Sequence, residues 1–333
     1  MKALLEPRRE GIYCPPGDFF IDPVRPVPRA VVTHAHADHC RPGHAALLAT
    51  PETVALALTR YGEEAFGTTQ GLALGEPLTV GGATVRLVPA GHVLGSAQVV
   101  VERHGARAVV SGDYKRHGDP TCAPFEPVVC DLFVTEATFG LPVFRHPPVA
   151  AEVGRLVRSL ETFPERAHAV GTYALGKAQR LIVELRRAGH DRTIWLHGAL
   201  MKLCETYERL GVPLGPLGHA TDTERDALRG EIVLAPPGAL NEPWARRLPD
   251  PVIAAASGWM RVRQRARQRG VELALVISDH ADWDELTATI VETGAPEVWV
   301  THGAEEALCH WCGTRGIAAR GLSLSALGED SES

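Results

Sequence analysis

The chain lacks any long apolar run. Nowhere in its 333 residues do the about 20 consecutive apolar side chains occur that a membrane-spanning helix needs. The first ten residues, MKALLEPRRE, have no extended apolar core, so we expect no secretion signal. Seven cysteines, an odd number, fit free thiols in a reducing compartment. These absences predict a cytoplasmic protein that does not bind a membrane.

The chain also lacks an excess of positive charge. Lysine and arginine total 34 against 40 aspartates and glutamates, which gives a net charge of −6. This excludes a generally basic nucleic-acid-binding protein but leaves room for a local cationic site, such as bound metal ions. No Walker A loop occurs, so no nucleotide cofactor is expected. The single CxxC, at residues 309–312, has no second pair to complete a zinc knuckle.

The densest motif in the chain is THAHADH at residues 33–39, directly after a short apolar run that predicts a buried strand. His34 and His36 are two residues apart, so on an extended backbone both point to the same side. Asp38 and His39 follow where the chain should turn, and they face a different point. The motif therefore offers two nitrogens to one metal ion and a carboxylate with a nitrogen to a second. Such ligands suit zinc, and manganese less well.

Further candidate ligands follow predicted strands. Apolar alternation predicts strands at residues 84–88 and 108–110, and His92 and Asp113 come shortly after them. His92 can complete a set of three nitrogens, and Asp113 has two oxygens with which to bridge two ions. Asp22, which precedes a proline-rich turn, either orients a ligand histidine through its other ring nitrogen or simply forms the turn.

From residue 149 the pattern changes to strands that alternate with helices. The predicted strands lie at residues 167–172, 193–196, 231–235 and 252–256. Such alternation predicts a parallel α/β sheet. We therefore expect a second α/β domain at residues 141–258, inserted into a domain that comprises residues 1–140 and 259–333.

Three more polar residues stand at the ends of predicted strands, and a separate segment is strongly basic. Glu136 ends the strand 132–136, and His280 and His302 follow the predicted strands 273–277 and 297–300. The one basic run, residues 261–269, has arginine at every second position. It could follow a phosphate backbone or be a solvated surface segment.

Taken in order, these motifs resemble the metal-binding series of the metallo-β-lactamase fold and the β-CASP nucleases within it. The metal-binding part is carried by His34, His36, Asp38, His39, His92 and Asp113. The β-CASP part is carried by Glu136 in TEATFG, by YALGKAQ at 173–179, by SGWM at 257–260, and by His280 and His302. The resemblance spans roughly residues 10–305. It implies an α/β fold, a metallo-β-lactamase αββα sandwich with an inserted α/β β-CASP domain.

The resemblance also implies a hydrolase that uses two divalent metal ions, with zinc favoured and manganese the alternative. The ligands would be His34, His36 and His92 for one ion, Asp38, His39 and His302 for the other, and Asp113 as the bridge. Two ions about 3.5–4 Å apart can lower the pKa of a bridging water towards ~7, and the hydroxide attacks phosphorus in line. His280, oriented and kept partly cationic by Glu136, then protonates the leaving 3′ oxygen. In the alternative assignment His302 is the acid and His280 the ligand.

Among β-CASP proteins the chain resembles most the bacterial ligase-associated DNA exonucleases. This implies a DNA exonuclease in DNA repair, with an ATP-dependent DNA ligase and a helicase as partners. Candidate substrate contacts are Lys177, Ser257, Arg261 and Arg263.

Other functions remain open at this point. His302 favours an RNA-processing nuclease, either an endonuclease or a 5′-exoribonuclease, because RNA-acting members carry histidine where DNA-acting members often carry valine. A small-molecule metallohydrolase needs neither the insertion of about 120 residues nor the basic run. A scaffold without metal is disfavoured because every ligand position is filled.

Overall fold

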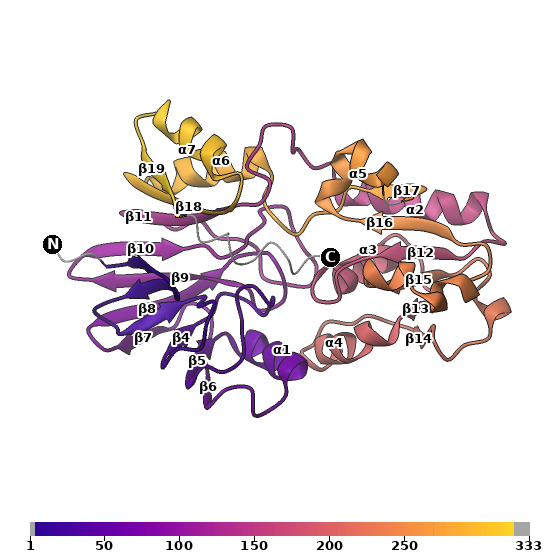
Figure 1. Cartoon of the computed structure of the whole chain (residues 1–333), viewed down its shortest axis with the longest axis horizontal. Coiled ribbons are helices and arrows are strands. Elements are labelled where there is room, and N and C mark those ends of the chain that lie inside the picture. Colours follow the sequence, from indigo (N-terminus) through magenta and orange to yellow (C-terminus); the bar gives the residue numbers. More distant parts are fainter. Residues whose placement is uncertain (1–3, 269, 323–333) are drawn as a thin grey trace. The chain divides into compact units, whose positions relative to one another are not determined.

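The computed structural model describes residues 4–268 and 270–322, and the chain divides into two compact units (Figure 1). The first comprises the described residues of Met1–Arg145 and His280–Glu332, and the second comprises those of His146–Asp279. The second boundary therefore lies later than the expected one at residue 258. The reason is that β17 (Leu273–Leu275) pairs in parallel with β16 (Val252–Ala256) inside the second unit. The end of the expected range 259–333, residues 323–333, lies outside the described residues.

The first unit contains two mixed sheets. The first sheet has the order β1 (Glu6–Arg8), β2 (Gly11–Cys14), β3 (Phe19–Ile21), β4 (Ala30–Val31), β5 (Ala46–Ala49), β6 (Thr68–Gly71). The second has the order β19 (Ala318–Gly321), β18 (Glu297–Gly303), β11 (Leu132–Ala137), β10 (Ala106–Val110), β9 (Ala97–Arg103), β8 (Ala83–Pro89), β7 (Pro77–Val80).

The alternation of side chains along β9 shows how this unit is packed. Val99 and Val101 lie in a core that also contains Ile21 of the first sheet, so the two sheets share one apolar core. Val100, on the opposite face of β9, lies in a separate core with Leu286 of α6 (Trp283–Thr293). Successive strand residues point to opposite faces, which is why one valine run serves both cores. Helices α1 (Pro51–Tyr61) and α7 (Glu305–Gly313) contribute to the outer cores.

Several local predictions are confirmed in this unit. Strands β8 and β10 contain the predicted strands 84–88 and 108–110. In addition, the structure shows that α6 begins with a capping box, in which the side chains of Asp282 and Glu285 each accept a backbone N–H from the other residue. The strand expected before the THAHADH motif is present as β4, and it is only two residues long.

The second unit is built on one six-stranded parallel sheet, as the alternation of strands and helices predicted. Its order is β14 (Leu217–His219), β13 (Ile194–Leu196), β15 (Ile232–Ala235), β12 (His168–Gly171), β16, β17. Its α-helices are α2 (Val149–Thr162), α3 (Lys177–Arg187), α4 (Gly198–Arg209) and α5 (Arg263–Gln268). All residues of β12 and β15 are buried, as expected of central strands in a parallel sheet.

Among the described residues, no helix has the length and apolar character that crossing a bilayer requires.

Candidate metal centre

Three histidines and one aspartate converge at the ends of strands in the first unit. Nδ1 of His36 lies 3.1 Å from Nε2 of His34 and 3.0 Å from Nε2 of His92. Oδ2 of Asp113 lies 3.4 Å from the same nitrogen of His34 and 3.7 Å from that of His92. All four side chains offer one ligand atom within 4.8 Å of the others. The structure therefore brings together the first predicted set of ligands.

A second group of donors shares Asp113 with the first. Nε2 of His39 lies 3.4 Å from Oδ2 of Asp113 and 3.6 Å from Oδ2 of Asp38. The oxygen of Asp113 that faces His34 is thus the same oxygen that faces His39. A carboxylate in this position is suited to bridging two cations.

The backbone at Gly112 allows Asp113 to reach this position. Gly112 has a φ of +55°, and a Cβ added there would lie 2.5 Å from Oγ1 of Thr33. Only glycine fits this close approach between the end of β10 and the THAHADH motif.

Asp22 lies behind both groups of donors. Its carboxylate accepts the backbone N–H of Thr33 at 2.8 Å and the hydroxyl of Thr33 at 2.6 Å, and it lies 2.7 Å from Nδ1 of His39. An ionised carboxylate only accepts hydrogen bonds, so Nδ1 of His39 carries a proton and Nε2 is the nitrogen that can bind a metal ion once its own proton is lost. The hydroxyl of Thr33, which already donates to Asp22, accepts from Nδ1 of His34 at 3.0 Å. Nε2 of His34 is therefore also left as an acceptor.

The pKa values show how strongly these groups interact. Burial lowers the pKa of His39, but the carboxylates of Asp113, Asp38 and Asp22 outweigh burial and hold it well above the ordinary value. Burial raises the pKa of Asp113, but His39 and His280 outweigh it and hold that pKa well below its usual range. Burial, together with His34 and His280, holds the pKa of His92 well below that of a free histidine. The centre is thus an ionised carboxylate among closely spaced ring nitrogens.

The donor set fits divalent metal ions. Nε2 of His39 is buried and has no hydrogen-bond partner within residues 4–268 and 270–322. Buried polar atoms are normally satisfied, so an atom of this kind calls for an explanation such as an ion. Imidazole nitrogens with carboxylate oxygens are ligands that zinc prefers, and manganese binds them less well.

His302 lies beside the second group, at an irregularity in the sheet. Thr301 pairs with Glu136 and Gly303 pairs with Ala137, so His302 is an extra residue in β18, with a φ of +57°. Bulges of this kind re-aim a side chain. The ring of His302 stacks on that of His39 with 5.0 Å between centroids. Among the described residues, however, His302 is in none of the groups whose ligand atoms all lie within 4.8 Å.

His280 and Glu136 form a third contact at the centre. Nδ1 of His280 lies 2.9 Å from Oε2 of Glu136, whose other oxygen accepts the backbone N–H of Tyr114 at 2.8 Å. Nδ1 of His280 also lies 3.9 Å from Oδ2 of Asp113. Because Glu136 holds Nδ1, a proton exchanged with a substrate would pass through Nε2 of His280.

The four predicted substrate contacts differ in their surroundings. Lys177 is buried and pairs with Asp279 in the second unit, at 3.5 Å, so its ammonium already has a carboxylate partner. The hydroxyl of Ser257 accepts the backbone N–H of Trp259 at the start of a 3-10 turn. Arg261 and Arg263 are exposed, and within the described part of the chain neither takes part in an ion pair.

The first unit also contains a cavity, not predicted from the sequence, that adjoins the second group of donors. The cavity has a volume of about 230 Å³ and is bordered by Asp38, His39 and His302. Its walls are mainly apolar, and its lining also includes two exposed arginines, Arg9 and Arg25. The apolar lining residues are Ile12, Ile21, Val24, Val110 and Val134. They come from both sheets and a loop, so no single stretch of sequence indicates this cavity.

The chain is similar to nucleic-acid enzymes along most of its length. No profile of a known protein family matches it. A probable DNA ligase of Opitutus terrae is 28% identical over 330 residues, which is 97% of this chain and 31% of the ligase. A ribonuclease of Thermus thermophilus is 32% identical over 52% of this chain and 46% of the ribonuclease. An endoribonuclease of Aspergillus fumigatus is 33% identical over 32% of this chain and 13% of the relative. The chain thus spans less than half the length of each of these curated relatives.

A solved structure shows a similar fold. It is that of a protein of unknown function from Enterococcus faecalis, with a TM-score of 0.58 and 15% identity over 87% of this chain and 78% of the other.

Proposed function

The chain belongs to the metallo-β-lactamase-fold β-CASP family of nucleases, and on that premise we propose that it is a metal-dependent phosphodiesterase that degrades DNA from an end. The observation that carries the proposal is the pair of donor groups joined by one oxygen of Asp113, with His280 beside them. We assign the first unit to the metallo-β-lactamase domain, with an αββα arrangement, and the second unit to the β-CASP insertion.

We assign the ligands in two sets that share Asp113. The first consists of His34, His36 and His92, and the second of Asp38, His39 and His302. Two divalent ions held there, zinc by preference and manganese otherwise, would supply positive charge for the phosphoryl oxygens and a nucleophile from water at neutral pH. Asp22 keeps the protons of His34 and His39 on Nδ1, which turns Nε2 of each ring towards the centre.

His280 is the proposed proton donor to the leaving 3′ oxygen. Glu136 holds its Nδ1 at 2.9 Å and is itself fixed by the N–H of Tyr114, so the ring has one defined orientation. A general acid must lie within hydrogen-bond reach of the leaving oxygen, directly or through one water, and we assign that contact to Nε2. His302, which stacks on His39, is assigned to the second metal ion rather than to proton transfer.

The cavity beside His39 supports action at a strand end. An exonuclease must enclose the terminus of its substrate, whereas an endonuclease needs an open passage. Apolar walls can accept a base, and Arg9 and Arg25 can attract phosphate. Arg261 and Arg263, exposed and without ion pairs among the described residues, are proposed as contacts to the phosphate backbone.

We prefer DNA as the substrate because a relative that matches nearly the whole chain is a probable DNA ligase. We therefore propose an ATP-dependent DNA ligase as a partner in DNA repair, in the cytoplasm. A helicase partner rests on the family resemblance alone. The second candidate function is RNA processing, which the ribonuclease and endoribonuclease relatives and the presence of His302 favour.

One assay tests substrate, end and metal together. Matched DNA and RNA strands, single and double, with 5′-phosphate, 5′-hydroxyl or circular ends, are incubated with the apoprotein and zinc, manganese or magnesium. We expect release of mononucleotides from linear DNA and none from circles, with zinc or manganese. Preferential cleavage of RNA would overturn the choice of substrate, and cutting of circular DNA would overturn the exonuclease assignment. A His36→Ala variant is the control for contaminating nucleases.

A further inference from the structure

The boundary between the two units falls between Asp279 and His280. Asp279 belongs to the second unit, and its side chain is buried there. His280 belongs to the first unit, and its ring lies at the metal centre. The peptide bond between these residues therefore joins the proposed acid to the interior of the other unit.

Asp279 is held by two cations from the start of α3. Oδ1 of Asp279 accepts from Nη1 of Arg180 at 3.1 Å, and Oδ2 lies 3.5 Å from Nζ of Lys177. The same nitrogen of Arg180 donates to the backbone oxygen of Ser278 at 2.6 Å. Both the side chain of Asp279 and the backbone before it are thus fixed.

All three charged side chains of this network are nearly inaccessible. Asp279, Lys177 and Arg180 are each 3% exposed. Buried ion pairs cost desolvation energy and often contribute little to stability relative to apolar replacements. What they do provide is a defined geometry, because hydrogen-bonded charges tolerate few arrangements. Because burying these charges is costly and the network adjoins His280, we infer that its role is to position this residue.

On the other side of His280 the chain is fixed as well. The N–H of Ala281 donates to the backbone oxygen of Tyr114 at 2.5 Å, and Asp282 is the N-cap of α6. His280 is therefore the one residue between an anchor in the second unit and an anchor in the first. Glu136 then fixes the rotation of the ring.

We propose that Lys177, Arg180 and Asp279 form a positioning network that sets the place of His280 for proton transfer. The inference rests on the proposed function, in which His280 is the acid. It gives Lys177 a role different from the predicted phosphate contact. Because a displacement of about 1 Å can cost on the order of 10²-fold in rate, a loosened Asp279 lowers turnover without removing any reacting group.

The test uses two substrates that differ in their need for an acid. Single-stranded DNA has a 3′-alkoxide leaving group, which needs a proton. The 4-nitrophenyl ester of thymidine 5′-phosphate loses 4-nitrophenolate, which leaves without one. For Asp279→Asn in the full chain we expect a loss of kcat on DNA on the order of 10–10²-fold, KM within about twofold, and ester hydrolysis within about twofold of the wild type.

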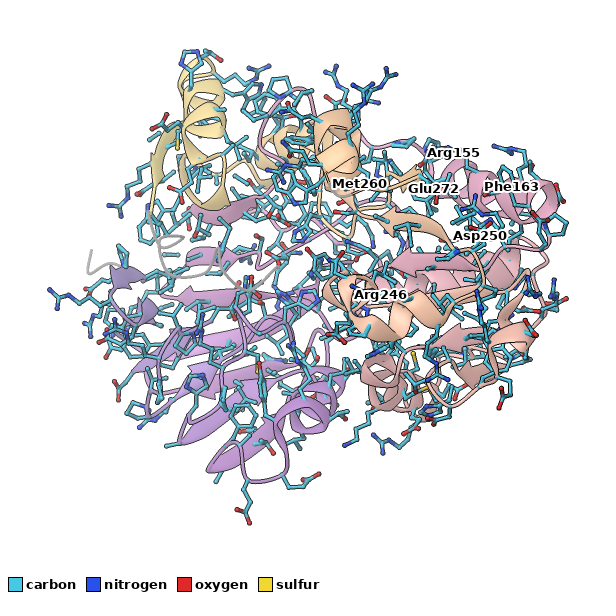
Figure 2. The ribbon with its side chains drawn as sticks, turned by 45° about the vertical axis from the view of Figure 1, so that its right-hand side comes forward. Arg155, Phe163, Arg246, Asp250, Met260 and Glu272 are labelled. Carbon is cyan, nitrogen blue, oxygen red and sulfur yellow. The ribbon has the colours of Figure 1, made fainter. Side chains whose placement is uncertain are left out.

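Two further variants keep the result interpretable. Arg166→Met removes a different charged cluster of the second unit, formed with Asp250 and Glu272, both labelled in Figure 2, and should leave both substrates unaffected. Arg180→Lys keeps the charge but cannot replace both hydrogen bonds of the guanidinium. It should show the same selective loss in a milder form, and it serves if Asp279→Asn does not fold.

The outcomes separate the network from the proposed function. If Asp279→Asn lowers kcat equally on both substrates, or on neither, while His280→Ala loses DNA cleavage selectively, the positioning role is wrong and the acid assignment stands. If His280→Ala loses no more activity on DNA than on the ester, the assignment of His280 as the acid is wrong, whatever the result for Asp279→Asn. In a His280→Ala background, Asp279→Asn should cost nothing further on DNA, because the two changes act on one step.

Discussion

The carboxylate of Asp22 lies 2.7 Å from Nδ1 of His39, although the two residues are 17 positions apart in the sequence. Through the hydroxyl of Thr33 the same carboxylate also fixes the ring of His34. Asp22, which belongs to neither donor group, therefore orients one imidazole ring in each of them. Asp22 has a φ of +45°, an uncommon conformation for a residue other than glycine, as is often found at functional sites.

We expect Asp22→Asn to weaken metal binding by about 10–100-fold, since outer partners of ligand histidines typically contribute that much. The amide can no longer accept both the hydroxyl of Thr33 and the proton of His39. Competition with a chelator of known affinity measures the effect. Asp18→Asn is the matched control, because Asp18 also has a positive φ but its carboxylate bonds only to the exposed Tyr13 hydroxyl and lies near Arg29. Equal metal affinity in both variants would contradict the role of Asp22.

Single replacements of His280 and His302 test which of the two is the proton donor and which is the metal ligand. His280→Ala should keep its full metal content and lose turnover on the order of 10²–10⁴-fold, because only the proton donor is removed. His302→Ala should lose metal from the second group. Elemental analysis of the dialysed proteins, alongside turnover on DNA, checks both. Loss of metal in His280→Ala with full metal in His302→Ala would reverse the two assignments.

Gly303→Ala should destabilise the protein by more than about 1 kcal/mol and lower its activity. Gly303 has a φ of +95°, and a Cβ there would lie 2.2 Å from the backbone oxygen of Ala137. The bulge that places His302 would have to shift. Gly313→Ala, at the end of α7, is the control, because a Cβ there meets no atom within 4 Å. Urea unfolding and DNA turnover measure the two effects, and similar stability of both variants would refute the close-approach argument.

Arg261→Ser and Arg263→Ser should weaken DNA binding uniformly across sequences. Each should reduce the slope of log affinity against log salt concentration by about 1 if the side chain contacts phosphate. Binding is measured by fluorescence anisotropy at several salt concentrations with the metal-free protein. Arg229→Ser is the control, because Arg229 is exposed but pairs with Asp226 at 3.0 Å. An unchanged slope in all variants would assign the arginine run to the solvated surface.

The second unit should lose stability in mild acid because of His168. Burial lowers the pKa of His168, outweighing the hydrogen bonds to Arg166 and Ser159 and the charge of Glu272. Below about pH 6.5 the unfolded histidine binds a proton that the folded one does not, so the free energy of unfolding falls as the pH drops through that value. Above that pH, His168 is neutral in both states and no longer lowers the free energy of unfolding.

Urea unfolding between about pH 5 and pH 8 measures this dependence. His168→Gln should reduce the slope of the unfolding free energy against pH by up to the equivalent of one proton. Arg166→Met removes only one of the smaller causes of the lowered pKa of His168, so it should keep most of the slope. A wild-type slope that persists in His168→Gln would assign the acid sensitivity to another group.

Much of the fold could be predicted because it depends on local patterns. The strands that end before His92 and Asp113, and the strands that contain Glu136 and His302, follow from apolar runs. The unit boundary near residue 279 could not be predicted, because the pairing of β17 with β16 is a long-range contact. The contact of Lys177 with Asp279 could not be predicted either. A lysine that follows a glycine has the same sequence pattern whether its side chain contacts a phosphate or a buried carboxylate.

The sequence by itself determined which donor atoms exist and where along the chain they stand, since the spacing of His34, His36, Asp38 and His39 is covalent. The tertiary structure decided which carboxylate oxygen faces both donor groups, which ring nitrogens face the centre, and which residues hold these rings in place. Those relationships connect Asp22 to His39, Asp113 to both donor groups, and Asp279 to its two cations. They depend on strands and helices that meet only when the chain folds, because side chains distant in sequence are brought together by packing and not by spacing.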